Sequence, residues 1–430
     1  MTLLTENNTG IGAQLLAQVQ HPMCLLLLQM VLILLVSRIF GLIFSRIRQP
    51  AVIGEIVAGI FLGASVFGSM WPHFFNVVFP ATSIGNLDVL SKIGLAFFMF
   101  IIGMELDLNE LKRQAKSVLI ISSCSIAIPF ICGMGLAFYL FPNFSMPGVS
   151  FLVFSIFIGI SLSITAFPVL ARIIKNRALQ KTPLGTLVLS IAALGDVMAW
   201  CILAVIIAIA KSGSFSMTLF TLGGTIVFIL LMLFLVRPFL EKLISRLRIA
   251  HYGDSNVVVL SFIVLLLSAF TSELIGIHML FGAFLAGVLI PHNETLKHTL
   301  TSKLEDVSVL LLLPIFFALT GLRLHIGLLD SGDMLIVCIG IVLVATIGKF
   351  IGSALPARLL GMSWKDSMSI GIFMNTRGLM ELVVLNIGYE LGILSPELFA
   401  MLTIMAIVTT IMTSPLLDLT EYFFQKKNIS

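Results

Sequence analysis

The sequence predicts an all-α polytopic membrane protein, and three observations agree on this. Of its 430 residues, 59% are hydrophobic and 11% are charged, whereas a soluble domain carries about 25% charged residues. The mean hydropathy is +1.13. The apolar residues form long runs rather than the short alternating strands of a transmembrane barrel. A net charge of +4 in such a chain gives no indication of a nucleic-acid partner.

A bilayer-length window predicts thirteen transmembrane helices. The ninth is short, and its boundary with the eighth near Ile275 is the least distinct, so twelve helices are the alternative. The thirteen are expected near residues 23–45, 50–69, 87–105, 115–141, 149–173, 184–210, 217–240, 255–275, 277–291, 305–323, 333–358, 364–389 and 395–422.

The basic residues fall mostly on one side of this arrangement. The side opposite them holds Lys92, Lys211 and Arg323. The positive-inside rule therefore predicts an outside N-terminus and a cytoplasmic C-terminus, in a multi-pass protein of the cell (inner) membrane. The loops after odd-numbered helices hold Arg46, Arg48, Lys112, Arg113, Lys116, Arg172, Lys175, Arg177, Lys181, Arg237, Lys242, Arg246, Arg248, Lys297, Lys303, Arg358 and Lys365, and Lys426 and Lys427 follow the last helix.

A weak internal similarity predicts two inverted repeats. The run from Ala96 to Asp107 in the third helix parallels the run from Ile315 to His325 in the tenth. Helices seven apart have opposite orientations, so the repeat is inverted. We expect an extracytoplasmic leader (1–22), a first repeat of six helices (23–210), a linker helix (217–240), a second repeat (255–422) and a short cytoplasmic tail (423–430).

Inverted repeats of this kind place transport sites where helices are interrupted at corresponding positions. The fifth helix contains the run from Ser161 to Pro168, in which Ser163 and Thr165 can satisfy carbonyls that proline leaves free. The twelfth contains the run from Met374 to Gly378, which suits a lipid-facing helix poorly. We therefore expect both helices to be broken there. Two ordinary kinked helices are the alternative.

Asp196 is an isolated acid near the middle of the sixth predicted helix. A carboxylate at mid-membrane costs roughly 2.5 to 3.5 kcal/mol on insertion scales, so it is by default a site for binding or relaying an ion. The structural alternative is a carboxylate that merely ties two helices together. Lys349, in the eleventh helix, needs a partner as well, and the carbonyl ends of a broken helix or Asp196 could serve.

Three further charged residues in predicted helices are candidates for the site. Arg377 and Glu381 are four residues apart, so they could pair along one helix face or take part in gating. Glu55 lies near the cytoplasmic end of the second helix, where an acid is tolerated. Glu55 and Ser163 are both secondary candidates for the site.

Three runs resemble the monovalent cation:proton antiporter-2 family of the sodium/hydrogen exchanger superfamily, which includes Kef-type proteins and plant cation/H+ exchangers. They are Gln49 to Gly63, Ser163 to Arg172 and Asn375 to Leu382. The resemblance implies an NhaA-like fold and a homodimer, with a core bundle (helices 4–6 and 11–13) that moves like an elevator against a dimerisation bundle. It also implies that Asp196 carries the ion, that Thr165 and Asn375 lie at the crossed breaks, and that Lys349 is the basic residue of the core.

Two features depart from the family pattern. Electrogenic relatives carry paired aspartates, whereas Gly195 precedes Asp196. The chain also stops shortly after the last predicted helix, so we expect no regulation by the nucleotide-binding domain of Kef-type proteins.

We expect Asp196 to bind one alkali cation, Na+ or K+, or one proton in turn, which gives electroneutral exchange unless Lys349 also releases a proton. No cofactor is expected. The alternatives are a sodium-coupled organic-anion symporter of similar fold and a gated efflux channel or sensor on an antiporter scaffold. An enzyme is not expected, because no nucleophile and base, metal cluster or phosphate loop is visible.

Overall fold

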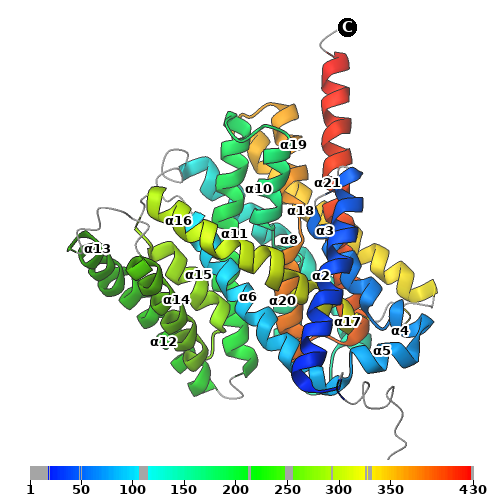
Figure 1. The fold of residues 1–430 in the computed structure, drawn as a ribbon. Helices are drawn as coiled ribbons and strands as arrows, with labels where there is room; N and C mark the ends of the chain where they lie inside the picture. The colour runs from blue at the N-terminus through cyan, green and yellow to red at the C-terminus, as the bar shows by residue number, and fades with distance from the viewer. Residues whose placement is uncertain are drawn as a thin grey trace, which may run out of the picture.

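The computed structural model describes residues 18, 20–47, 49, 51–105, 115–211, 215–246, 255–291, 294–324, 327 and 332–427, and these residues are almost entirely helical (Figure 1). Most of the predicted leader and the end of the tail lie outside this range. The first half comprises α2 (Pro22–Arg46), α3 (Ala51–Leu62), α4 (Phe67–Met70), α5 (Pro72–Val78), η1 (Ala81–Ser83), α6 (Ile84–Glu105), α8 (Ala115–Phe144), α9 (Phe151–Ser161), α10 (Phe167–Asn176) and α11 (Pro183–Lys211). The second comprises α12 (Phe215–Leu231), η2 (Met232–Val236), α13 (Arg237–Arg246), α14 (Ser255–Ile275), α15 (Met279–Leu289), α16 (Glu294–Glu305), η3 (Asp306–Leu312), α17 (Leu313–Arg323), α18 (Gly332–Leu359), α19 (Trp364–Met374), α20 (Leu379–Glu390) and α21 (Pro396–Lys427).

Eleven helical segments in the described part of the chain are long and apolar enough to cross a membrane. Two more predicted crossings coincide with shorter apolar helices, α9 and α15. Large apolar side chains on the outer helices face away from the protein, as in Phe138, Phe234 and Ile336, which are 70%, 75% and 68% exposed. Such a surface is stable only against lipid or another apolar partner, so the chain is a multi-pass membrane protein.

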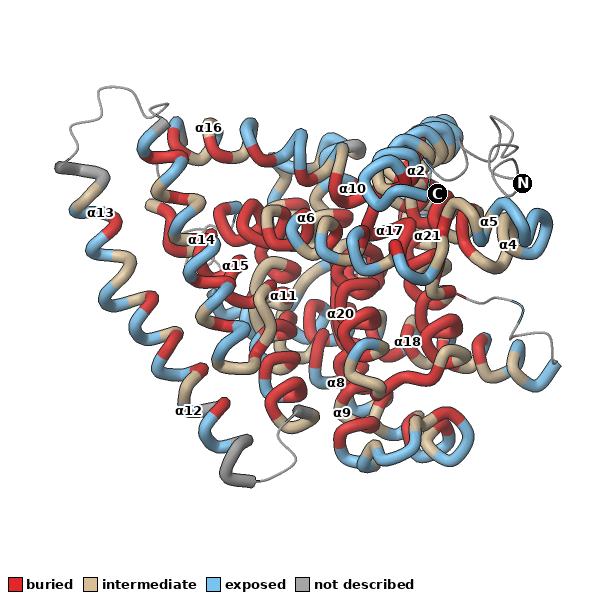
Figure 2. Tube along the Cα trace, turned by 60° about the horizontal axis from the view of Figure 1, so that its bottom comes forward, coloured by how far each residue is buried: buried red, intermediate tan, exposed pale blue. Residues whose placement is uncertain are grey.

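The helices pack as two bundles. In the first bundle, α2, α3, α6, α14, α15 and α17 contact one another. In the second bundle, α8, α9, α10, α11, α18, α19, α20 and α21 do the same, and α12 contacts one helix of each, α11 and α14. Figure 2 shows buried residues concentrated in the middle of the molecule, around α20, whereas much of α2, α12 and α13 is exposed. The second bundle coincides with the core bundle that the family resemblance implies.

Glycines bring helices of the first bundle into close contact, and two of these crossings join the two halves of the chain. A Cβ on Gly59 of α3 would lie 2.1 Å from the carbonyl oxygen of Phe317 in α17. One on Gly103 of α6 would lie 2.2 Å from the carbonyl oxygen of Phe284 in α15. Small residues let transmembrane backbones approach in this way. The similarity that predicts the repeat lies on α6 and α17, and each of these helices takes part in one of the two crossings.

Some boundaries differ from the sequence predictions. The second predicted helix ends at Leu62 rather than near residue 69, and a turn at Gly63 leads into the short helices α4 and α5. The prediction of a loop between the ninth and tenth helices is wrong in part, because Lys297 and Lys303 lie on α16. That helix is polar on average and packs along α6, so a search for apolar runs could not find it.

Candidate functional site

The fifth and twelfth predicted helices are both broken, at the positions that their sequences predict. α9 ends at Ser161, and α10 begins at Phe167 with a proline in its first turn. α19 ends at Met374, and α20 begins at Leu379. Gly378 precedes α20 with φ at 130°, a conformation that residues with a side chain rarely adopt. Proline in one half of the chain and glycine in the other thus explain why neither helix continues.

The two breaks contact each other through their backbones. The N–H of Ala166 donates to the carbonyl of Thr376 at 3.0 Å. The hydroxyl of Thr165 donates to the carbonyl of Met374 at 2.9 Å. Each interrupted segment therefore satisfies polar groups that the other segment leaves free, and this is how irregular backbone is tolerated at membrane depth. Thr165 and Asn375 lie on these segments, as expected.

Asp196 lies in the middle of α11 and is 2% exposed. Neither of its carboxylate oxygens has a hydrogen-bond partner among the described residues. The N–H of Phe167, at the positive end of α10, acts on this carboxylate without reaching hydrogen-bond geometry, and the ammonium of Lys349 acts on it through its charge. An ionised carboxylate without hydrogen bonds is costly in a buried position, so Asp196 is suited to bind a cation or a proton.

Other buried oxygen atoms near the breaks also lack a partner among the described residues. They are Oδ1 of Asn375, Oγ of Ser161 and one oxygen of Glu381, Oε1. Carboxylate, amide and hydroxyl oxygens are the ligand types that hard cations prefer. These atoms and Asp196 offer the chemistry needed to replace part of the water around an alkali cation.

Two buried cations bind the carbonyl end of α9. The ammonium of Lys349 donates to the carbonyls of Ser163 and of Ser125, the second at 2.9 Å. Arg377 donates to the carbonyl of Ser161 at 2.6 Å and to that of Leu162. Of the two partners expected for Lys349, the carbonyl end of a broken helix is therefore the one that binds it directly. Asp196 contributes at longer range.

Arg377 and Glu381 form the ion pair that their spacing predicts, at 3.2 Å and fully buried. The contacts of Arg377 with α9 were not predicted, because nothing in the sequence connects residues 216 positions apart. Ser163 donates to the carbonyls of Ile126 and Gly159, so its hydroxyl stabilises the end of α9.

Glu55 belongs to the other bundle. It is on α3, and the charges that act on it are those of Arg172, on α10, and Arg38. The structure thus places Asp196, Thr165, Asn375, Lys349, Arg377, Glu381 and Ser163 in the second bundle, and Glu55 outside it.

The chain is similar to known proteins over most of its length. The family described as sodium/hydrogen exchanger, transmembrane, matches residues 31–419. The Na(+)/H(+) antiporter NhaS4 of Synechocystis sp. is 42% identical over 397 residues, which cover 92% of this chain and 97% of that protein. The fold also resembles that of the sodium proton antiporter MjNhaP1 from Methanocaldococcus jannaschii, with a TM-score of 0.62, 18% identity, and coverage of 90% and 94% of the two chains.

Longer relatives match over the same region. Cation/H(+) antiporter 17 of Arabidopsis thaliana is 38% identical over 398 residues, and K(+)/H(+) antiporter 1 of Saccharomyces cerevisiae is 34% identical over 406 residues. The chain spans 48% and 46% of their lengths, respectively. The family is one of transporters and not of enzymes. With a family match that extends over most of its length, the chain belongs to the sodium/hydrogen exchanger family.

Proposed function

We propose that this protein exchanges a monovalent alkali cation, Na+ or K+, for a proton by alternating access at Asp196. The observation that carries the proposal is the buried carboxylate of Asp196, which has no hydrogen-bond partner among the described residues and lies beside two crossed helix breaks. Relatives named as Na(+)/H(+) and K(+)/H(+) antiporters support both the reaction and the choice of cations.

Competition for one carboxylate is sufficient for exchange. A cation and a proton both neutralise Asp196, and each excludes the other, so the bundle carries one or the other across. The hydrogen bond from Thr165 to the carbonyl of Met374 holds the two breaks together. The side-chain amide oxygen of Asn375 is a further ligand for the cation. Movement of the second bundle against the first then exposes the occupied carboxylate to one side at a time.

We further propose thirteen crossings in two inverted repeats (23–210 and 255–422) joined by a linker helix (217–240). In this topology the leader (1–22) lies outside and the tail (423–430) lies in the cytoplasm, at the cell (inner) membrane. The glycine crossings of α3 with α17 and of α6 with α15 support the repeat, since each joins one helix from either half. The exposed apolar faces of the first bundle support a homodimer through that bundle.

Proteoliposomes containing a pH-sensitive dye test the function. Addition of NaCl, KCl or LiCl to acid-loaded vesicles should alkalinise the lumen for the transported cation. Asp196→Asn keeps the size of the side chain but removes the titrating oxygen, so it should abolish the signal. If Asp196→Asn still exchanges cations for protons, the carboxylate does not carry the ion.

The stoichiometry is proposed to be one to one, because Gly195 leaves Asp196 without a paired aspartate. An exchange rate that does not respond to a potassium–valinomycin diffusion potential supports this stoichiometry. Acceleration at either polarity would instead show that a second group, such as Lys349, moves charge in each cycle.

A further inference from the structure

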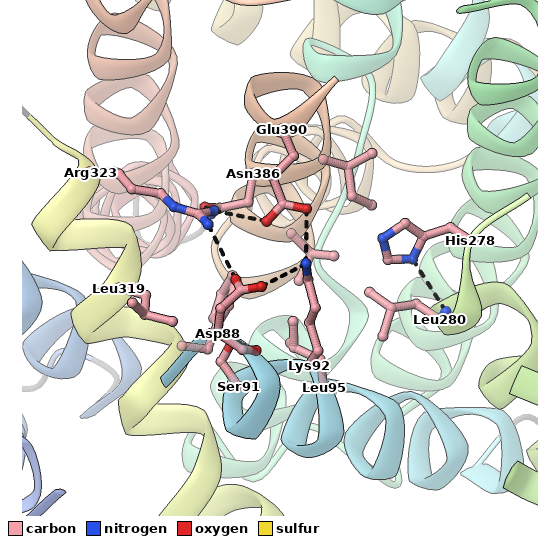
Figure 3. A pocket seen from close by; sticks show the side chains of 13 residues that line it. Asp88, Ser91, Lys92, Leu95, His278, Leu280, Leu319, Arg323, Asn386 and Glu390 are labelled. Atoms are coloured by element: carbon pink, nitrogen blue, oxygen red, sulfur yellow. Dashed lines mark hydrogen bonds and ion pairs between the residues drawn. The ribbon is translucent and has the colours of Figure 1, made fainter. Parts of the chain in front are cut away.

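A second group of charged side chains lies far from Asp196, where α6 begins and α17 and α20 end. Asp88 and Lys92 are on α6, Arg323 is the last residue of α17, and Glu390 is the last residue of α20. They line a pocket together with Asn386 of α20 (Figure 3). Glu390 lies eleven residues beyond the start of α20, or roughly 16 Å along the helix from the break.

These four charged residues form a closed ring of ion pairs. Lys92 contacts Asp88 at 2.8 Å and Glu390 at 3.2 Å. Arg323 contacts Glu390 at 3.0 Å and Asp88 at 3.2 Å. Each cation thus lies between the same two carboxylates, and the charges of the ring sum to zero.

The ring joins the two bundles. Asp88, Lys92 and Arg323 belong to the first bundle and Glu390 belongs to the second, in which α20 packs mainly against α21 and α9. Asn386 adds two contacts across the same boundary: it accepts from Arg323 at 2.8 Å and donates to Thr320 of α17 at 3.0 Å. Elsewhere, Arg177 of α10 pairs with Asp418 of α21, within the second bundle.

The ion pairs of the ring are weak enough to break when the bundles move. Its side chains keep 20% to 34% of their surface exposed, and ion pairs between partly exposed groups are individually weak because water can replace each partner. Four such contacts closed on one another hold the ends of the helices together, yet each can be lost to solvent when α20 moves away from α6.

We infer that Asp88, Lys92, Arg323 and Glu390 form a lock between the two bundles, which closes the outer route to Asp196 and opens in the outward-facing state. The inference rests on the proposed alternating access, since a lock between bundles matters only if they move. Glu390 is the essential member, because the pairs of Lys92 and Arg323 that cross the boundary both end on its carboxylate.

Accessibility of the pocket beneath the ring tests the lock. Ser91 lines that pocket, is 3% exposed and follows Asp88 on α6. In a variant with its native cysteines replaced, Ser91→Cys reports opening through its rate of reaction with a membrane-impermeant methanethiosulfonate added from outside. Glu390→Gln should raise that rate at least fivefold and lower the apparent KM for external cation. Lys92→Gln should act in the same direction and provides a second variant if Glu390→Gln does not fold.

Asp418→Asn is the matched control, because it removes an ion pair within the second bundle and should change the rate less than twofold. Unchanged labelling in both Glu390→Gln and Lys92→Gln overturns the lock. Asp196→Asn separates the two proposals. If it leaves exchange intact while labelling still responds to Glu390→Gln, the carrier role of Asp196 fails and the lock stands. If Asp196→Asn abolishes exchange while the labelling rate does not respond to Glu390→Gln, the carrier role of Asp196 stands and the lock fails.

Discussion

The ammonium of Lys349 donates to the backbone carbonyl of Ser163, although the two residues lie 186 positions apart and in opposite halves of the chain. This bond ties α18 to the end of α9, where the first helix break begins. Removal of the donor leaves a buried carbonyl without a partner, which costs about 1 to 3 kcal/mol.

Lys349→Met removes the donors and should therefore lower the melting temperature in detergent by several degrees and reduce exchange at least tenfold. Lys349→Arg keeps the positive charge and the donors, so it should retain more of both. If Lys349→Met matched the wild type in both assays, the proposed support of α9 by Lys349 would be wrong.

The shared use of Asp196 predicts how cation affinity depends on pH. Because one carboxylate binds either a proton or a cation, the apparent KM for the cation should rise roughly tenfold for each pH unit below the pKa of that carboxyl group. The maximal rate should change much less. Initial rates measured from pH 5.5 to 8.5 at several cation concentrations give both quantities. A KM independent of pH over this range would show that protons and cations do not compete at one site.

The hydrogen bond from Thr165 to Met374 predicts a difference between two substitutions. Thr165→Val preserves shape but removes the hydroxyl, so the carbonyl of Met374 loses this donor and the contact between the two breaks is weakened. The cation KM should rise about five- to tenfold. Thr165→Ser restores the hydroxyl and should return the KM to within about twofold of the wild type. Equal KM values for the valine and serine variants would exclude this role.

Gly195 offers a test of the stoichiometry. A Cβ at this position would meet no atom of another element within 4 Å, so the position tolerates the first atom of a side chain. Gly195→Asp creates two adjacent carboxylates and should make exchange sensitive to an imposed potential. Gly195→Asn, with an uncharged side chain of the same size, should remain insensitive. The comparison fails if the two variants respond to voltage alike.

The glycine crossing of α3 and α17 predicts a strong effect on stability alone. Gly59→Ala places a methyl group against the carbonyl of Phe317, and overpacking of this kind costs about 1 to 3 kcal/mol. The variant should melt several degrees lower by fluorescence-detected size-exclusion. Gly135→Ala on α8 is the control, because its Cβ meets no atom within 4 Å. It should melt within about one degree of the wild type.

Sequence reasoning located the elements of the site that depend on local chemistry. Proline and glycine marked the two breaks, and the i, i+4 spacing offered the pair of Arg377 with Glu381. The unfavourable placement of Lys349 indicated that it needs a partner, with helix-end carbonyls as one of two candidates. Each of these follows from neighbouring residues and from the low polarity of the bilayer.

Contacts between distant segments could not be predicted in this way. Arg377 looked satisfied by Glu381, so its bonds to the end of α9 gave no separate signal. The ring around Glu390 combines residues that, taken singly, are ordinary charges near helix ends. The amphipathic α16 could not be predicted from apolar runs, because a helix on the surface of a bundle does not need such a run.

Lys349 and Arg377 both bind carbonyls of the bundle to which they themselves belong. A displacement of that bundle against its neighbour therefore breaks none of these bonds, and the buried charges travel with their own solvation shell of peptide groups. The free-energy cost of placing two cations at membrane depth is thus incurred during folding and not repeated in each transport cycle. The barrier to movement is left to the contacts at the seam between the bundles, where small changes can tune the turnover rate without disturbing the ion site.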